Sequence, residues 1–264
     1  MQDLTTTIIQ TNLAWKDRDA NLVFFEKKIS GLEEHTDLVI LPEMFNTGFV
    51  TEPEDVAETM DGHSIGWMKR MAAASGITIT GSLIIREDKR FYNRLIWMRP
   101  DGSYDCYDKR HLFSLAGEDE KFSQGKEQLI VEIKGWKIMP MICYDLRFPV
   151  WSKNRMEGDK YMYDCVLYMA NWPSTRNHAW KSLLVARAIE NLSYSIGVNR
   201  IGIDGTGKDY TGDSAVIDPL GHHVVVAVPS QEAVLTATLS VDLLRDIRKK
   251  IPFGMDWDGF EIEL

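Results

Sequence analysis

The sequence is poor in thiols, and its histidines are not clustered. Its three cysteines, Cys106, Cys143 and Cys165, are an odd number without Cys-x-x-Cys spacing. This pattern argues against a disulfide framework and leaves at least one thiol free. The six histidines are scattered, without a His-Glu-x-x-His motif or cysteines at ligand spacing. The sequence therefore predicts no metal site.

Long apolar runs and an excess of positive charge are also missing. No apolar stretch approaches the ~18–20 residues that cross a bilayer. The 30 basic and 39 acidic residues give a net charge of −9, which would repel a phosphate backbone or an anionic membrane surface. The opening MQDLTTTIIQTNLAW has no cationic segment ahead of an apolar one, unlike a secretory signal. We expect a cytoplasmic protein that binds neither nucleic acid nor membranes.

No linker, low-complexity tract or repeat divides the 264 residues, so we expect a single domain over residues 1–264. Hydrophobic periodicity and turn signals predict an alternation of strands and helices. In chain order, the main ones are a strand at 4–11, a helix at 17–30, a strand at 37–41, a helix at 64–74, strands at 77–85, 90–98, 136–143 and 164–170, a helix at 178–192 and a strand at 194–199. This order indicates an α/β fold in which two sheets pack face to face with helices outside.

Three predicted strands end in polar residues. Glu43 follows the apolar strand DLVIL behind Pro42, Lys109 ends the strand YDCYDK, and Cys143 ends IMPMIC. Functional groups collect where the strands of an α/β fold end. Spacing alone leaves the alternative open, because a strand-end cysteine is commonly a small buried residue and a strand-end charge commonly lies in solvent.

These residue types could hydrolyse an amide by a mechanism that uses no histidine. A thiolate is the nucleophilic form of cysteine, and a nearby cation such as Lys109 favours it. A carboxylate at Glu43 can take the thiol proton and later deliver it to a leaving amine. The Lys109 ammonium and the backbone N–H of Tyr144, next to Cys143, are the candidates for stabilising an oxyanion.

The residues around these strand ends resemble those of a known family. LPEMFNTGF is similar to the glutamate motif of the nitrilase, or carbon-nitrogen hydrolase, superfamily; YDKRHLF resembles its lysine motif and ICYDLRFP its cysteine motif, in the family's order. NWP, HAW and GDS resemble the forms found in bacterial members of the omega-amidase branch. The resemblance implies a four-layer αββα sandwich, a homodimer, and a triad of Glu43, Lys109 and Cys143 that uses no cofactor.

The resemblance also implies a second glutamate after the lysine motif, and Glu118 in LAGEDEKF fits that place better than Glu120. Its implied role is to position Lys109 and the substrate. The implied activity is that of an omega-amidase, which hydrolyses the terminal amide of a small dicarboxylic monoamide, such as 2-oxoglutaramate or 2-oxosuccinamate, to the 2-oxo acid and ammonia through a thioester on Cys143. The alternatives are a carbamoylase, aliphatic amidase or nitrilase of the same superfamily, or a non-catalytic binding protein on the same fold.

The substrate-binding residues are inferred from their places beside the strand ends. An anionic substrate requires a cation, and Arg176 in NWPSTRNH follows a predicted strand end. The alternative for Arg176 is an exposed loop arginine. Phe45, Tyr144 and Trp172 are candidate apolar walls, with core packing as the alternative.

The C-terminal tail, about residues 250–264, interleaves apolar with acidic residues. Its apolar side chains are Trp257, Phe260, Ile262 and Leu264. Chain termini fray unless something holds them, and exposed apolar area costs ~25 cal/mol per Å². The resemblance implies that the tail packs across the dimer interface, and the alternative is that it folds back on its own protomer.

Overall fold

Two six-stranded sheets form the centre of the computed structural model, which describes residues 1–263. The first sheet has the order β16, β1, β2, β3, β4, β5. Its strands β1, β2 and β3 run parallel to one another, whereas β16, β4 and β5 join by antiparallel pairing. The bounds of these strands are β1 Leu4–Gln10, β2 Leu38–Ile40, β3 Thr78–Glu87, β4 Arg90–Met98, β5 Tyr104–Asp108 and β16 Ala233–Leu239.

The second sheet repeats this plan with the order β15, β14, β11, β10, β7, β6. Its strands β7, β10 and β11 are parallel, and β6, β14 and β15 join by antiparallel pairing. The bounds are β6 Val131–Ile133, β7 Trp136–Ile142, β10 Cys165–Ala170, β11 Tyr194–Asn199, β14 Ala215–Ile217 and β15 His223–Val226.

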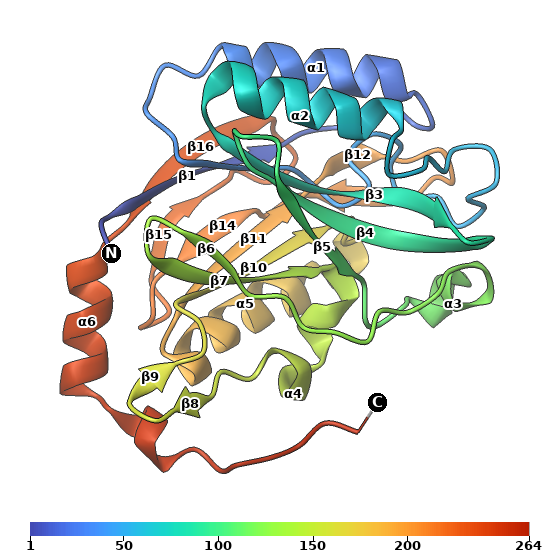
Figure 1. The fold of residues 1–264 in the computed structure, drawn as a ribbon. Coiled ribbons are helices and arrows are strands. Elements are labelled where there is room, and N and C mark those ends of the chain that lie inside the picture. Colours follow the sequence, from blue (N-terminus) through green and yellow to red (C-terminus); the bar gives the residue numbers. More distant parts are fainter. Residues whose placement is uncertain (264) are drawn as a thin grey trace.

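Helices cover the outer faces of both sheets. Helices α1 (Arg18–Ser30) and α2 (His63–Ser75) lie on the first sheet, and α5 (Asn177–Asn191) lies on the second (Figure 1). The two sheets face each other between them. The α/β class and the predicted four-layer αββα sandwich are therefore confirmed.

Local signals explain why the predicted helices agree so well with the structure. The helix predicted at 17–30 corresponds to α1 at Arg18–Ser30. At its N-cap, the Asp17 side chain accepts a hydrogen bond from the Ala20 N–H at 3.1 Å. The helix predicted at 64–74 corresponds to α2 at His63–Ser75. Gly76 follows the last residue of α2 and has a φ of 69°. An N-cap carboxylate and a left-handed glycine mark helix ends through short-range contacts, so a sequence can reveal them.

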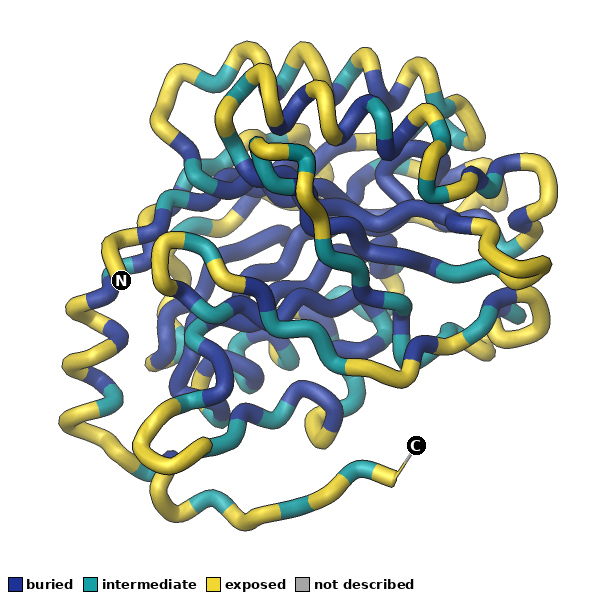
Figure 2. The backbone as a smooth tube through the Cα atoms, viewed as in Figure 1, coloured by how far each residue is buried: buried dark blue, intermediate teal, exposed yellow. Residues whose placement is uncertain are grey.

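The strand β2 is apolar along its whole length because both of its faces are covered. Leu38 and Ile40 pack in the core between the sheets, whereas Val39 and Leu41 pack on the side of α1 and α2. Successive side chains of a strand point to opposite faces, so both faces need apolar residues. Buried residues fill the middle of the molecule, and exposed ones lie on the outer helices and the tail (Figure 2).

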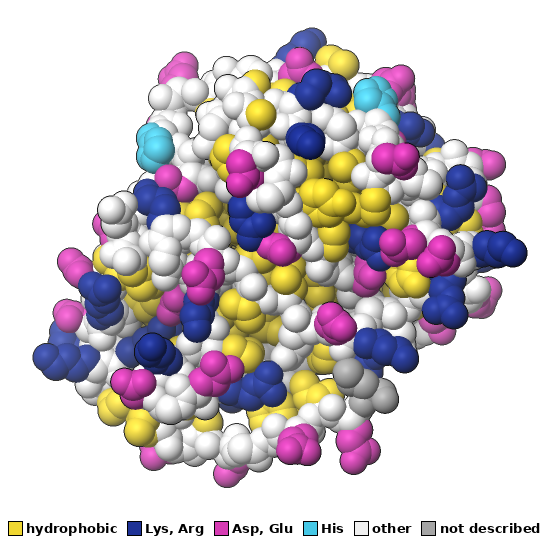
Figure 3. Space-filling model, in the orientation of Figure 1, with side chains coloured by type: hydrophobic (Ala, Val, Ile, Leu, Met, Phe, Trp, Pro, Cys, Tyr) yellow, Lys and Arg dark blue, Asp and Glu magenta, His cyan; other side chains and the backbone are white. Residues whose placement is uncertain are grey.

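Several short elements were not predicted. They are α3 (Glu118–Lys121), α6 (Val241–Lys250), the hairpin of β8 (Met156–Glu157) and β9 (Lys160–Tyr161), and the hairpin of β12 (Ile201–Ile203) and β13 (Asp209–Thr211). The sequence does predict a helix from about Phe148, and the structure has α4 at Pro149–Ser152. On the face seen in Figure 3, acidic and basic side chains are interspersed around apolar ones. No helix within residues 1–263 is both long and apolar enough to span a membrane.

The C-terminal tail runs past the β8–β9 hairpin and α4 (Figure 1). Trp257 packs edge-on against the Tyr161 ring, with centroids 5.7 Å apart, and the Lys153 ammonium lies 3.8 Å from the Trp257 ring. Ile262 packs at the border of the main core. These contacts lie within one chain, and Leu264 is outside the described residues.

Candidate active site

Strand ends from both sheets meet at the site. Glu43 follows β2, Lys109 follows β5, Cys143 follows β7 and Asn171 follows β10. The backbone N–H of Asn171 donates to Glu43 Oε2 at 2.8 Å, and its side-chain Nδ2 donates to the Glu43 carbonyl at 2.6 Å. These two bonds join the end of a first-sheet strand to the end of a second-sheet strand.

Glu43, Lys109 and Glu118 form a buried ion cluster. The Lys109 ammonium donates to Glu43 Oε1 at 2.9 Å and to Glu118 Oε1 and Oε2 at 3.1 and 2.8 Å. All three side chains are fully buried. Glu120, the alternative to Glu118, is exposed.

An asparagine completes this buried ion cluster and was missed in the sequence. Asn93 Nδ2 donates to Glu43 Oε1 at 2.8 Å and to Glu118 Oε1 at 3.1 Å, so one amide joins the two carboxylates. Asn93 lies in β4 and is fully buried. Buried asparagine side chains need polar partners, so a polar residue inside an apolar strand was the signal that could have revealed it.

The electrostatics of the cluster keep Lys109 charged and the thiol protonated. Burial alone would lower the pKa of Lys109, but the carboxylates of Glu118 and Glu43 outweigh it and raise that pKa. Burial, together with the negative charge of Glu43, raises the pKa of the Cys143 thiol well above its usual range, although Lys109 acts in the opposite direction. These effects together favour the protonated thiol of Cys143.

Cys143 lies in a tight turn between β7 and α4. Its φ of 44° is in the left-handed region, which costs a residue with a side chain about 1–3 kcal/mol unless the surroundings hold it. The turn continues as a 3₁₀ helix over Cys143–Arg147, and α4 begins at Pro149. The carboxylate of Asp145 accepts from the Ile142 N–H at 3.1 Å and so holds the residue before Cys143.

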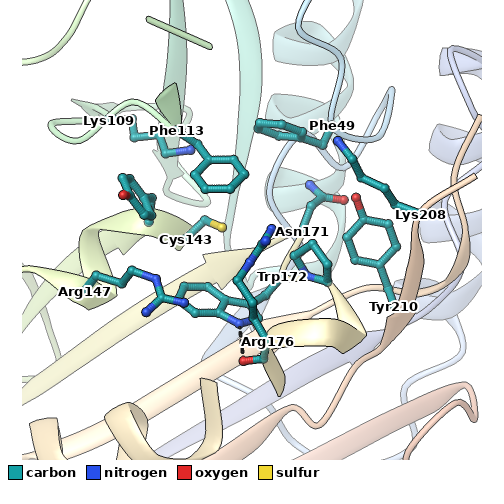
Figure 4. Close-up of a pocket in the computed structure, with 12 residues that line it drawn as sticks. Phe49, Lys109, Phe113, Cys143, Arg147, Asn171, Trp172, Arg176, Lys208 and Tyr210 are labelled. Atoms are coloured by element: carbon teal, nitrogen blue, oxygen red, sulfur yellow. Dashed lines mark hydrogen bonds between the residues drawn. The ribbon is translucent and has the colours of Figure 1, made fainter. Parts of the chain in front are cut away.

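A small open pocket of about 390 Å³ leads to Cys143. Apolar walls come from Phe113, Trp172 and Tyr210, among others (Figure 4). Besides Lys109, three cations line the pocket: Arg147, Arg176 and Lys208. We call these three residues the cationic rim. Within residues 1–263 no carboxylate forms an ion pair with any of them.

Comparison with known proteins assigns a family to this arrangement. The family model described as carbon-nitrogen hydrolase matches residues 5–249. The chain belongs to the carbon-nitrogen hydrolase family. It is 41% identical over 262 residues to the omega-amidase YafV of Escherichia coli (strain K12), covering 99% of this chain and 100% of that protein. It is 31% identical over 252 residues to the 2-oxoglutaramate amidase of Bacillus subtilis (strain 168), covering 94% and 95%.

A solved structure agrees with this assignment. XC1258 from Xanthomonas campestris, a CN-hydrolase superfamily protein with an arsenic adduct in its active site, is 44% identical to this chain. The TM-score is 0.97, and the match covers 100% of both chains. The resemblance to the carbon-nitrogen hydrolase superfamily, closest to the omega-amidase branch, is confirmed.

Of the residues that the sequence proposed for substrate binding in this carbon-nitrogen hydrolase, Tyr144, Trp172 and Arg176 line the pocket, but Phe45 does not. The Phe45 ring packs against Phe25 and Trp67 beneath α1 and α2, with centroids 5.6 and 5.8 Å away. The prediction for Phe45 is therefore corrected.

The reason for this correction is the alternation of side chains along this segment. Val39 and Leu41 pack on the side of α1 and α2, and Phe45, four residues after Leu41, packs on that same side. Phe49, six residues after Glu43, lines the pocket in its place.

The other two cysteines of this carbon-nitrogen hydrolase lie away from the pocket. Cys165 is fully buried in β10, and Cys106 in β5 packs at the edge of the helix-side core. Burial raises the pKa of the Cys106 thiol to about 11. No cluster of three or more metal-ligating side chains occurs within the part of the chain that the structure describes.

Proposed function

We propose that this protein is a cysteine-dependent omega-amidase that hydrolyses the terminal amide of a small dicarboxylic monoamide, such as 2-oxoglutaramate or 2-oxosuccinamate, to the 2-oxo acid and ammonia. One observation carries the proposal: Cys143 and Lys109 line a pocket whose cationic rim has no carboxylate partner within residues 1–263, and the buried Glu43 pairs with Lys109 at 2.9 Å. The activities named for the E. coli and B. subtilis relatives support it.

The proposed reaction begins with proton transfer. Glu43 takes the proton from the Cys143 thiol, and the resulting thiolate attacks the amide carbonyl carbon. The Lys109 ammonium, together with the backbone N–H of Tyr144, stabilises the oxyanion that forms. Glu118 keeps Lys109 in place through its two hydrogen bonds.

The tetrahedral intermediate then collapses to a thioester. Glu43 delivers its proton to the leaving nitrogen, the carbon–nitrogen bond breaks and ammonia departs. A water molecule that gives a proton to Glu43 attacks the thioester carbonyl. The carbon–sulfur bond breaks, the proton returns to the sulfur of Cys143, and the free carboxylic acid is released.

The cationic rim suits the carboxylate at the far end of such a substrate. Arg176 lies over the Phe113 ring at 5.0 Å, and Arg147 lies over the Trp172 ring at 4.7 Å. Aromatic contacts of this kind orient a guanidinium while leaving its N–H groups free. The protein as a whole has a net charge of −9, so this local cationic group is the feature that draws an anionic substrate to the pocket.

Ammonia release across a substrate panel tests the proposal. We expect turnover of 2-oxoglutaramate and 2-oxosuccinamate to exceed that of propionamide, an aliphatic nitrile and an N-carbamoyl compound, with Cys143→Ala as the inactive control. Preference for the N-carbamoyl compound or the nitrile would favour the other activities of the superfamily. Absence of turnover on the whole panel by folded protein would favour a binding protein on the same fold.

We also propose that the protein is a homodimer, acts in the cytoplasm as a single domain over residues 1–264, and binds neither nucleic acid nor membranes. Exposed apolar side chains lie on β15, at Val224 and Val226, and on the outer side of α5, at Ile189. We propose that the homodimer interface covers these side chains. Light scattering on purified protein tests the assembly, and a monomer at micromolar concentration would contradict it.

A further inference from the structure

One buried carboxylate joins the segment that carries the lysine to the turn that carries the cysteine. Asp145 is fully buried. Its Oδ2 accepts from the Ile142 N–H at 3.1 Å and from the Tyr107 hydroxyl at 2.8 Å. Its Oδ1 accepts from the backbone N–H of His111 at 2.9 Å and lies 2.8 Å from His111 Nδ1. Four groups from the two segments therefore converge on one side chain.

The His111 ring is held on its face as well as at this nitrogen. It stacks on Phe148, with centroids 3.7 Å apart and planes 5° apart, and it meets Trp151 edge-on at 6.1 Å. An ionised carboxylate only accepts hydrogen bonds, so Nδ1 carries the hydrogen that points at Asp145. This bond is kept whether Nε2 is protonated or not, because Nε2 is not part of it.

The charged and titratable groups around the His111 ring are few. Asp145 faces it from the nucleophile turn, and the Tyr107 hydroxyl lies behind that carboxylate. The neighbouring Arg110 directs its guanidinium to the Gly125 carbonyl at 3.2 Å. The Asp145 carboxylate is thus the group through which the ring acts on the site.

We propose that His111 is a positioning residue that, through Asp145, sets the separation between the Lys109 ammonium and the Cys143 thiol. Lys109 lies two residues before His111, and Cys143 lies two residues before Asp145. The left-handed backbone of Cys143 is the part of the turn that most needs an external hold. The inference rests on the proposed function only for its turnover measurement.

Two substitutions separate the two contacts of the ring. His111→Phe keeps an aromatic ring on Phe148 but removes the bond to Asp145. His111→Asn removes the ring, but its amide nitrogen is attached to Cγ as Nδ1 is, so the bond to Asp145 can form. The matched control is His35→Phe, because His35 also pairs with an aspartate, Asp37, at 3.0 Å, and its side chain is 77% exposed.

The measurements are kcat and KM for the omega-amide, the melting temperature, and the pH dependence of iodoacetamide alkylation at Cys143, followed by mass spectrometry. Displacing a catalytic group by about 1 Å can cost about 100-fold, so we expect His111→Phe to lower kcat about 10–100-fold and to change KM less than about threefold. The alkylation midpoint should move to higher pH, because Lys109 lowers the Cys143 pKa and would be held less closely. We expect His111→Asn to recover most of both losses, and His35→Phe to match wild type.

A folded His111→Phe with wild-type kcat and alkylation midpoint would overturn the proposal, and so would equal losses in the Phe and Asn variants. If His111→Phe does not fold, His111→Gln, whose amide lies one carbon further from the backbone, takes its place. The alkylation measurement needs no omega-amide. A wild type that releases no ammonia would therefore refute the proposed function and still leave the role of His111 measurable.

Discussion

The buried ion cluster reaches the pocket through Lys109, and the cationic rim lines the same pocket, but the two regions hold their charges in different ways. Glu43, Lys109 and Glu118 are fully buried, and each charge has an opposite charge within 3.1 Å. The arginines of the rim contact aromatic rings, and Lys208 is exposed. Ion pairs that are out of water must be satisfied within the protein, whereas an unpaired cation near solvent stays available to a ligand.

This difference suggests a division of work between rigid and adaptable parts. The members of the buried ion cluster follow strands or are tied to them by several hydrogen bonds, so their geometry is set before substrate arrives. The rim lies on segments that follow the strands, including the β12–β13 hairpin that carries Lys208. We therefore expect cluster substitutions to lower kcat for every substrate, and rim substitutions to act on KM for anionic substrates.

The largest expected effect concerns the nucleophile. Cys143→Ala removes the sulfur that we propose forms the thioester, so we expect no detectable ammonia release, while the melting temperature stays near that of wild type. Cys165→Ala is the matched control, since Cys165 is buried in β10 away from the pocket. Full turnover by Cys143→Ala would remove the basis of the mechanism.

Next come the charged members of the buried ion cluster. Glu43→Gln removes the proposed proton acceptor and keeps the shape of the side chain, and Lys109→Met removes the charge that we propose stabilises the oxyanion. Loss of one oxyanion donor typically costs ~10²–10³-fold, and we expect losses in kcat of this size for omega-amides and simple amides alike. A loss below about tenfold in a folded variant would be too small for the assigned role.

A rim substitution should separate the two regions most clearly. A hydrogen bond to a charged group contributes about 1.5–3 kcal/mol, or about 10–100-fold. Arg176→Met should lower kcat/KM for 2-oxoglutaramate by that factor, mainly through KM, and leave propionamide turnover unchanged. Arg245→Met, at an exposed position of α6, is the control. Equal losses on both amides would abolish the distinction between rim and cluster.

A smaller loss is expected at Asn93, which touches the buried ion cluster without carrying charge. Asn93→Leu removes one of the two donors that Glu43 and Glu118 share and leaves Lys109 as the other, and unsatisfied buried groups cost about 1–3 kcal/mol. We expect about a tenfold fall in kcat and a lower melting temperature. Asn93→Asp would add a third carboxylate and should be worse. Wild-type kinetics and melting temperature in Asn93→Leu would show that the amide is dispensable.

The smallest effect on turnover is expected from the tail, which belongs to neither region. Truncation after Met255 removes Trp257 and its contacts with Tyr161 and Lys153. We predict a shift from dimer towards monomer or aggregate and an indirect fall in activity, measured by light scattering alongside ammonia release. An unchanged dimer would show that the tail packs only on its own chain.

Sequence reasoning succeeded where short-range chemistry decides the outcome. The Asp17 cap, the helix-ending Gly76 and the apolar run before Glu43 act within a few residues, so their elements could be predicted to within a residue or two. The resemblance of three motifs indicated Glu43, Lys109 and Cys143 together. The structure brings their strand ends to one place, and their roles stay predictions for the experiments above.

The sequence by itself determined which residues could do chemistry and the order of strands and helices, because these depend on residue type and local periodicity. Only the tertiary structure decided which side chains face one another. Asn93 meets two carboxylates that are distant in sequence, and Phe49 rather than Phe45 reaches the pocket because Phe45 packs on the side of α1 and α2. Such contacts depend on how two sheets pack and where a turn redirects the chain, which no short window of sequence contains.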